Sequence, residues 1–214
     1  MDEAEARWRA VAVDLALPEQ TSHDLLDELI LRYAEPHRHY HALPHVVTVL
    51  QTLDYLLDGV PQEVVTSLRL AAWYHDIVYD TRARHNEEQS ARLMLARLRA
   101  LDFPAAIADR AARMIRATAK HVIPGECPEA ALLLDADLAI LGAASADYDL
   151  YAAQIRQEYE WVPEAEYRAG RTKVLTSFLT RDHIFLSPTM LGRYEEPAIR
   201  NLKREIVTLA RPAA

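Results

Sequence analysis

The sequence places a histidine directly before an aspartate, His75 and Asp76, near the end of a segment that otherwise has the composition of a buried helix, AAWYHDIVYD. The apolar residues before this pair recur three and four apart, and continuing their stripe by one turn leads to the pair itself. Burying a carboxylate is costly unless a cation, a metal ion or several hydrogen-bond donors lie beside it. We therefore expect a compensating group beside Asp76.

Two further polar side chains are expected to face the same interior. Asp137 shares a helical face with the leucines around it in LLLDADLAIL, whereas Asp135 is expected to project elsewhere. His45 lies in the first turn of the helix that Pro44 is expected to open, at the edge of its apolar stripe. Two imidazoles and two carboxylates suit a divalent transition-metal ion with open positions for water and substrate. The spacing fits equally well an alternative in which the two inward aspartates form buried ion pairs with Lys or Arg.

The elements that must position these residues are predicted to be helices. Apolar residues recur three and four apart along most of the chain, and only five of the 214 residues are glycine. This pattern predicts an all-α fold, a compact single domain over residues 1–214. We predict helices at about residues 3–15, 22–34, 44–57, 62–80, 87–101, 104–121, 128–141, 146–160, 164–182 and 194–210.

Composition restricts the class of protein. The formal charge of −8 disfavours a nucleic-acid polymer as partner. The single cysteine excludes an intrachain disulfide and favours a reducing compartment. The N-terminus is acidic and lacks the apolar core of a secretory signal, and no apolar run is long enough for a membrane span. We therefore expect a cytoplasmic protein with no membrane partner, and the sequence leaves a homo-oligomer open.

The ordered set of a histidine, the His-Asp pair and a later aspartate resembles the HD-domain metal-dependent phosphohydrolases, an all-helical superfamily. It resembles more closely a bacterial group of uncharacterised, predicted HD phosphohydrolases. The stretches that carry the resemblance cover most of the chain: EPHRHYHALPHV, AAWYHDIVYD, HNEEQSA, ATAKH, LLDADLAILGA and IRQEY.

The resemblance implies that His45, His75, Asp76 and Asp137 are the ligands of a metal ion. It also implies a metal-site core at about residues 35–145, with the C-terminal helices packing on it. The expected cofactor is a divalent transition-metal ion (Mn, Fe, Co, Ni or Zn), one ion rather than two. The implied activity is hydrolysis of a small phosphorylated compound, with nucleotides among the candidates, because such an ion polarises a phosphoryl oxygen and activates water.

Two acids are candidates for proton transfer. Asp80 is expected one helical turn beyond Asp76, so that it can reach the same site, and its alternative role is that of a surface acid at the C-terminus of the helix. In the resemblance, Glu87 follows the His-Asp helix closely enough to line the pocket. Its alternative role is to stabilise the positive N-terminus of its own helix, which Asn86 is expected to cap.

Three basic residues are candidates for binding the phosphate of the substrate. Arg38 offers planar donors suited to phosphate, and its alternative role is that of a surface loop residue. Lys120 and His121 are expected to end a helix near the site. They equally fit solvated charges that interact with the helix dipole.

Two other functions fit the same pattern. Some HD-fold proteins bind two iron ions and act as oxygenases, and here His85 and His121 are the additional histidines, although they form no clear second-site pattern. The other alternative is an HD domain that binds a nucleotide or a partner protein without turnover.

Overall fold

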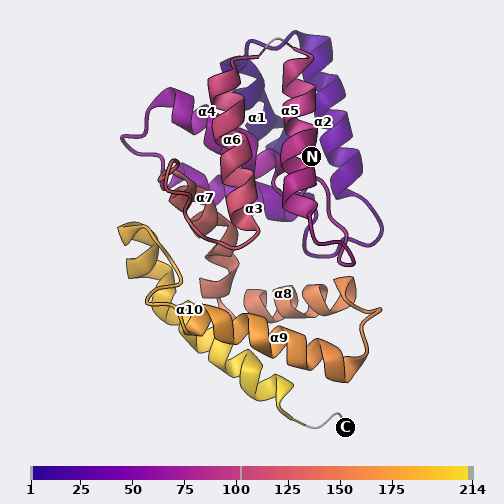
Figure 1. The fold of residues 1–214 in the computed structure, drawn as a ribbon, viewed down its shortest axis with the longest axis vertical. Helices are drawn as coiled ribbons and strands as arrows, with labels where there is room; N and C mark the ends of the chain where they lie inside the picture. The colour runs from indigo at the N-terminus through magenta and orange to yellow at the C-terminus, as the bar shows by residue number, and fades with distance from the viewer. Residues whose placement is uncertain (1, 102, 212–214) are drawn as a thin grey trace. The chain divides into compact units, whose positions relative to one another are not determined.

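The computed structural model describes residues 2–101 and 103–211, and every regular element in these residues is a helix (Figure 1). The all-α prediction is confirmed there, since the described ranges contain no strand. None of the described helices is both long and apolar enough to cross a membrane. In chain order the helices are α1 (Asp2–Asp14), α2 (Glu19–Tyr33), α3 (Leu43–Asp54), α4 (Gln62–Tyr74), α5 (Asn86–Arg99), α6 (Ala105–Thr118), α7 (Ala130–Asp137), the 3₁₀ helix η1 (Leu138–Gly142), α8 (Ser145–Glu158), α9 (Glu164–Leu179) and α10 (Pro188–Leu209).

The residues group into two compact units, the first ending at Ala136 and the second beginning at Asp137. This boundary falls inside α7, so Asp137 is the last residue of a helix whose other residues belong to the first unit. The expectation of one domain over residues 1–214, with a core at about 35–145, stays a prediction.

Helix α4 is the central helix of the first unit. It contacts α1, α3, α5 and α6, and ten of its thirteen residues are buried (Figure 1). A helix that is buried on nearly all sides needs apolar residues around its whole circumference, which explains the composition of its second half. Trp73 in its last turn packs edge-on against Trp8 of α1, with ring centroids 5.6 Å apart. The chain therefore leaves α4 from the middle of the core, and the next residue is His75.

Helix α4 ends at Tyr74, whereas the predicted helix extends through Asp80. The backbone carbonyls of Asp76 and Ile77 accept hydrogen bonds from Arg38, at 2.6 Å and 2.9 Å. Because these carbonyls bind a side chain from another segment, they do not accept the hydrogen bonds that would continue the helix, and the chain turns. The expected one-turn relation between Asp76 and Asp80 is therefore wrong.

Two other predicted helices differ from the observed ones, one in its helix type and one by more than a turn at its start. The predicted helix at 128–141 is α7 followed by the tighter η1. Helix α10 begins at Pro188 rather than near residue 194, because Ser187 caps it and proline suits the first helical position. The Oγ of Ser187 accepts a hydrogen bond from the backbone N–H of Met190 at 3.3 Å.

The second unit is held together by a buried ion pair as well as by apolar packing. Arg171 of α9 donates to both carboxylate oxygens of Glu205 in α10, at 2.8 Å and 3.1 Å. The hydroxyl of Tyr148 in α8 also donates to Glu205. Burial and the negative charge of Glu205 raise the pKa of Tyr148, so its phenol stays protonated as a donor. The three helices of this unit thus meet at one carboxylate.

The close approach of η1 to α10 gives a prediction about stability. A Cβ added to Gly142 would lie 2.6 Å from the backbone oxygen of Tyr194. We expect Gly142→Ala to lower the free energy of unfolding by about 1–3 kcal/mol, because either η1 or α10 must move. Gly170→Ala in α9 is the control, since its Cβ would meet nothing within 4 Å, and it should raise stability by up to about 1 kcal/mol. Urea denaturation of both variants measures the difference, and equal stabilities would contradict the packing described.

Candidate metal centre

Two buried imidazoles face each other at the end of α4. His75 is the C-cap residue of α4, and His45 is the third residue of α3. Their Nε2 atoms are 3.1 Å apart, and the two residues are only 1% and 5% exposed. The Nδ1 of His75 lies 2.9 Å from the carbonyl oxygen of Ala72. Because a carbonyl can only accept, Nδ1 carries a proton, and in the neutral imidazole the lone pair would lie at Nε2, which faces His45.

Asp76 contributes a carboxylate to the same point. Its Oδ2 lies 3.2 Å from the Nε2 of His75 and 3.7 Å from the Nε2 of His45. The side chain of Asp76 is 15% exposed, so the carboxylate lies at the edge of the cluster that solvent reaches. The side chains of His75 and Asp76 thus lie close together, and the pair lies in a turn and not in a helix.

Asp137 brings a second carboxylate from α7. Ligand atoms of His45, His75 and Asp137 all lie within 4.8 Å of one another, and Asp137 is half-buried. Asp137 ends α7, so a short helix with a buried apolar face carries the carboxylate toward the two imidazoles.

The donor atoms and their separations fit a transition-metal ion. Nitrogen and oxygen ligands lie about 2.0–2.2 Å from such an ion, so two ligands of one ion can be at most about 4.4 Å apart. The separations of 3.1, 3.2 and 3.7 Å among His45, His75 and Asp76 are all below this limit. Mixed imidazole and carboxylate donors favour Mn, Fe, Co, Ni or Zn over Ca²⁺.

The contrast between the two aspartates of α7 is not as expected. Asp135, which was expected to project away from the interior, is completely buried and has a polar interaction, whereas Asp137 is half-buried. The segment Leu133–Ala136 is buried at every position. Helical periodicity therefore could not separate an inward from an outward face here. The burial of the Asp135 carboxylate could not be predicted for this reason.

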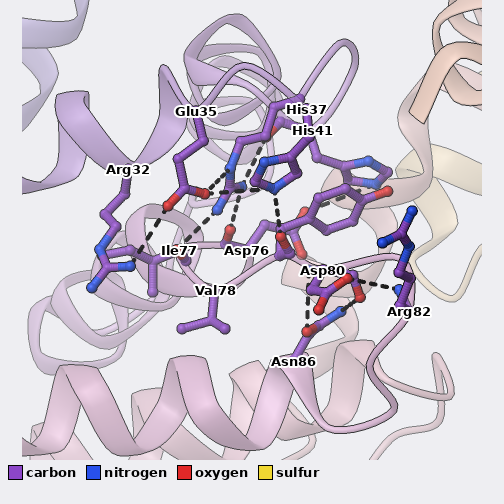
Figure 2. Close-up of polar contacts among 12 residues, drawn as sticks. Arg32, Glu35, His37, His41, Asp76, Ile77, Val78, Asp80, Arg82 and Asn86 are labelled. Atoms are coloured by element: carbon purple, nitrogen blue, oxygen red, sulfur yellow. Dashed lines mark hydrogen bonds and ion pairs between the residues drawn. The ribbon is translucent and has the colours of Figure 1, made fainter. Parts of the chain in front are cut away.

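The candidate proton-transfer residues lie beyond the end of α4. Asp80 is exposed, and its Oδ1 accepts a hydrogen bond from the backbone N–H of Arg82 at 2.8 Å. Asn86 is the first residue of α5 rather than its cap, and its amide group pairs with the backbone of Asp80. Figure 2 shows Asp80, Arg82 and Asn86 as a group of their own below Asp76. Glu87 is half-buried in the first turn of α5. Proton transfer by Asp80 or Glu87 stays a prediction.

The candidate phosphate-binding residues differ in their surroundings. The sequence predicts Lys120 and His121 at the end of a helix, but helix α6 ends at Thr118 and both residues lie beyond it. Lys120 is exposed, and His121 is half-buried with a positive φ of 49°. Arg38, by contrast, is buried, and its guanidinium donates to backbone carbonyls. Phosphate binding by these three residues stays a prediction.

His41 lies beside the candidate cluster and is not among the residues predicted from the sequence. Its Nε2 lies 4.0 Å from the Oδ2 of Asp76, and its ring stacks on Tyr79 with centroids 4.3 Å apart. Figure 2 shows His41 directed toward Asp76 from the loop between α2 and α3. The sequence feature that could have indicated His41 is the high local content of histidine, since four of the nine histidines occur within residues 37–45. Helical spacing could not detect it because this loop has no period.

Comparisons with models of protein families, with curated proteins and with solved structures give no match for this chain. The resemblance to HD-domain proteins therefore stays a proposal, and the geometry of the cluster is what supports it.

The cluster predicts a specific loss of metal binding. Asp137→Asn should weaken binding of Co²⁺ or Mn²⁺ by more than the roughly 10- to 100-fold that the loss of an outer-shell partner costs. The side-chain volume hardly changes, so the effect should reflect the lost negative charge. Asp58→Asn, at an exposed position in the loop after α3, is the control and should bind metal as the wild type does.

Elemental analysis and metal titration of the folded variants measure the effect. Asp135 is unsuited as a control because its buried carboxylate is expected to affect stability itself. Equal metal content in Asp137→Asn and Asp58→Asn would contradict the coordination and favour a buried ion pair.

Proposed function

We propose that this protein is an HD-type, metal-dependent phosphohydrolase that acts on a small phosphorylated compound. The observation that carries the proposal is the convergence of His45, His75 and Asp76, which come from two segments thirty residues apart, together with Asp137 from α7. The order of these residues in the chain matches the pattern that the resemblance implies. Every regular element of the described residues is a helix, as that resemblance also implies.

The residues of the cluster are suited to hold a divalent ion. The Nδ1–H of His75 donates to the carbonyl oxygen of Ala72, so the neutral imidazole, which is the form that binds metal, would present its lone pair at Nε2. Asp76 and Asp137 add two negative charges that would offset the charge of the ion. A bound divalent ion would polarise a phosphoryl oxygen and lower the pKa of water.

Access to the cluster favours a small substrate. The side chains of Asp76 and His41 are 15% and 22% exposed, while His45 and His75 are buried behind them. Solvent and a small molecule can therefore approach from the side of the acid and of the loop histidine. The net charge of −8 disfavours a long anionic polymer, because the negative surface as a whole would repel it. A single divalent ion would attract one phosphate group but would not reverse this overall repulsion.

Metal-dependent release of phosphate tests the proposal. The chelator-treated protein would be supplied in turn with Mn²⁺, Fe²⁺, Co²⁺, Ni²⁺ and Zn²⁺ and assayed on a panel of small phosphorylated compounds, nucleotides included. We expect release of inorganic phosphate only with added metal. Asp76→Ala should reduce it to background, whereas Asp58→Ala, at an exposed position, should not change it.

Oxygen consumption measured on the same preparations separates the rival functions. Iron-dependent oxygen uptake with no phosphate release across the panel would favour an oxygenase. Metal binding with neither activity would favour a domain that binds a nucleotide or a partner without turnover.

A further inference from the structure

Arg38 is a charged side chain in the interior of the first unit. It lies in the loop between α2 and α3, yet its side chain is 0% exposed. Arginine stays protonated in proteins, so a buried guanidinium needs partners for most of its five N–H groups. The nature of those partners indicates what the residue does.

The guanidinium of Arg38 joins two segments that lie far apart in the sequence. Nε donates to the carboxylate of Glu35 at 3.0 Å, which supplies the opposite charge. Nη1 donates to the carbonyl oxygens of His41 and Asp76, at 3.0 Å and 2.6 Å. Nη2 donates to the carbonyl oxygen of Ile77 at 2.9 Å. One planar group therefore holds the backbone of both His41 and Asp76, whose side chains meet at the candidate metal centre (Figure 2).

Two tyrosines hold the guanidinium in this place. Its central carbon lies 5.1 Å from the ring centroid of Tyr33 and 5.4 Å from that of Tyr79. The hydroxyl of Tyr33 donates to the carbonyl oxygen of Trp73 at 2.9 Å. Burial and the negative charge of Asp76 raise the pKa of Tyr33, so the phenol remains a neutral donor. The position of the arginine is thus fixed by the core.

We propose that Arg38 is a positioning residue of the metal centre and does not itself contact substrate. Its hydrogen bonds end α4 and turn the backbone after His75, so that the Oδ2 of Asp76 stays close to both imidazoles. The same fork holds the carbonyl of His41 and with it the loop that leads into α3 and His45. Four of its five N–H groups donate to Glu35 and to backbone carbonyls and the side chain is 0% exposed, so a phosphate could reach the guanidinium only by displacing neighbouring groups. This inference rests on the proposed function because it requires that the cluster binds a metal ion.

Arg38→Lys tests the inference. Lysine keeps the positive charge, but its three donors radiate from a single nitrogen and cannot serve four acceptors on two segments. We expect the Kd for Co²⁺ to rise about 10- to 100-fold, the range typical of outer-shell partners of metal ligands. We also expect the visible absorption spectrum of bound Co²⁺ to change, because the placement of the Asp76 carboxylate changes. A general loss of stability would not alter the spectrum of the metal-loaded folded protein.

Arg97→Lys is the matched control. Arg97 of α5 donates through Nε and Nη2 to the two carboxylate oxygens of Glu28 in α2, both at 2.7 Å, so this substitution also removes a two-point arginine contact in the first unit. It should leave the Co²⁺ affinity and spectrum as in the wild type. An Arg38→Lys variant with wild-type affinity and spectrum would overturn the inference while leaving the metal centre intact. A wild-type protein that binds no Co²⁺ would instead overturn the proposed function.

A second measurement uses the wild-type chain, so that the inference stays testable if Arg38→Lys does not fold. The side-chain N–H signals of Arg38 in an NMR spectrum should be slow to exchange with solvent because the group is buried and bonded. Adding Zn²⁺ should shift these signals, and adding inorganic phosphate to the Zn²⁺-loaded protein should shift them little. A large phosphate-induced shift at Arg38, or no response to Zn²⁺, would overturn the positioning role.

Discussion

The burial of charge at the end of α4 is the constraint on which the site depends. Asp76 follows directly after the central helix of the first unit with a side chain only 15% exposed, and withdrawing a carboxylate from water costs free energy. The structure places two kinds of compensation around it. The guanidinium of Arg38 lies against its backbone, and the imidazoles of His45 and His75 lie against its side chain. In the proposed function, a divalent ion bound by the Asp76 side chain would supply the remaining positive charge.

Rigidity follows from the same arrangement. Ligands of a metal ion must be held within about half an ångström of their productive positions, which is easier on helices packed in a core than on loops. His75 and Asp137 lie at the ends of α4 and α7, and His45 lies in the first turn of α3. The part of the site that lies on a loop, residues 35–42, is tied to the core by Arg38 instead. The helix ends are therefore held by packing in the core and the loop by the hydrogen bonds of Arg38, and both carry residues of one cluster.

The parts of the fold and the site that depend on local spacing were predictable, and those that depend on long-range hydrogen bonds were not. Apolar periodicity predicted the helices and placed His45, His75 and Asp76 on the sides of them that face the interior. The same periodicity extended α4 to Asp80, because the hydrogen bonds that end it come from Arg38, more than thirty residues earlier in the chain. His41 escaped detection because it lies in a loop that carries no helical period.

The two aspartates of α7 show a second limit of the sequence pattern. A stripe separates inward from outward residues only where one side of a helix faces solvent, and the segment Leu133–Ala136 is buried on every side. In such a segment an acid is assigned to a metal ion by its distance from other ligands. Asp137 lies near His45 and His75, with ligand atoms within 4.8 Å of one another, although it is less buried than Asp135. In the proposed function, a partly exposed carboxylate beside two buried imidazoles would leave water and substrate a path to the ion. On that proposal the more accessible of the two acids, Asp137, would be the ligand, and the fully buried Asp135 would not.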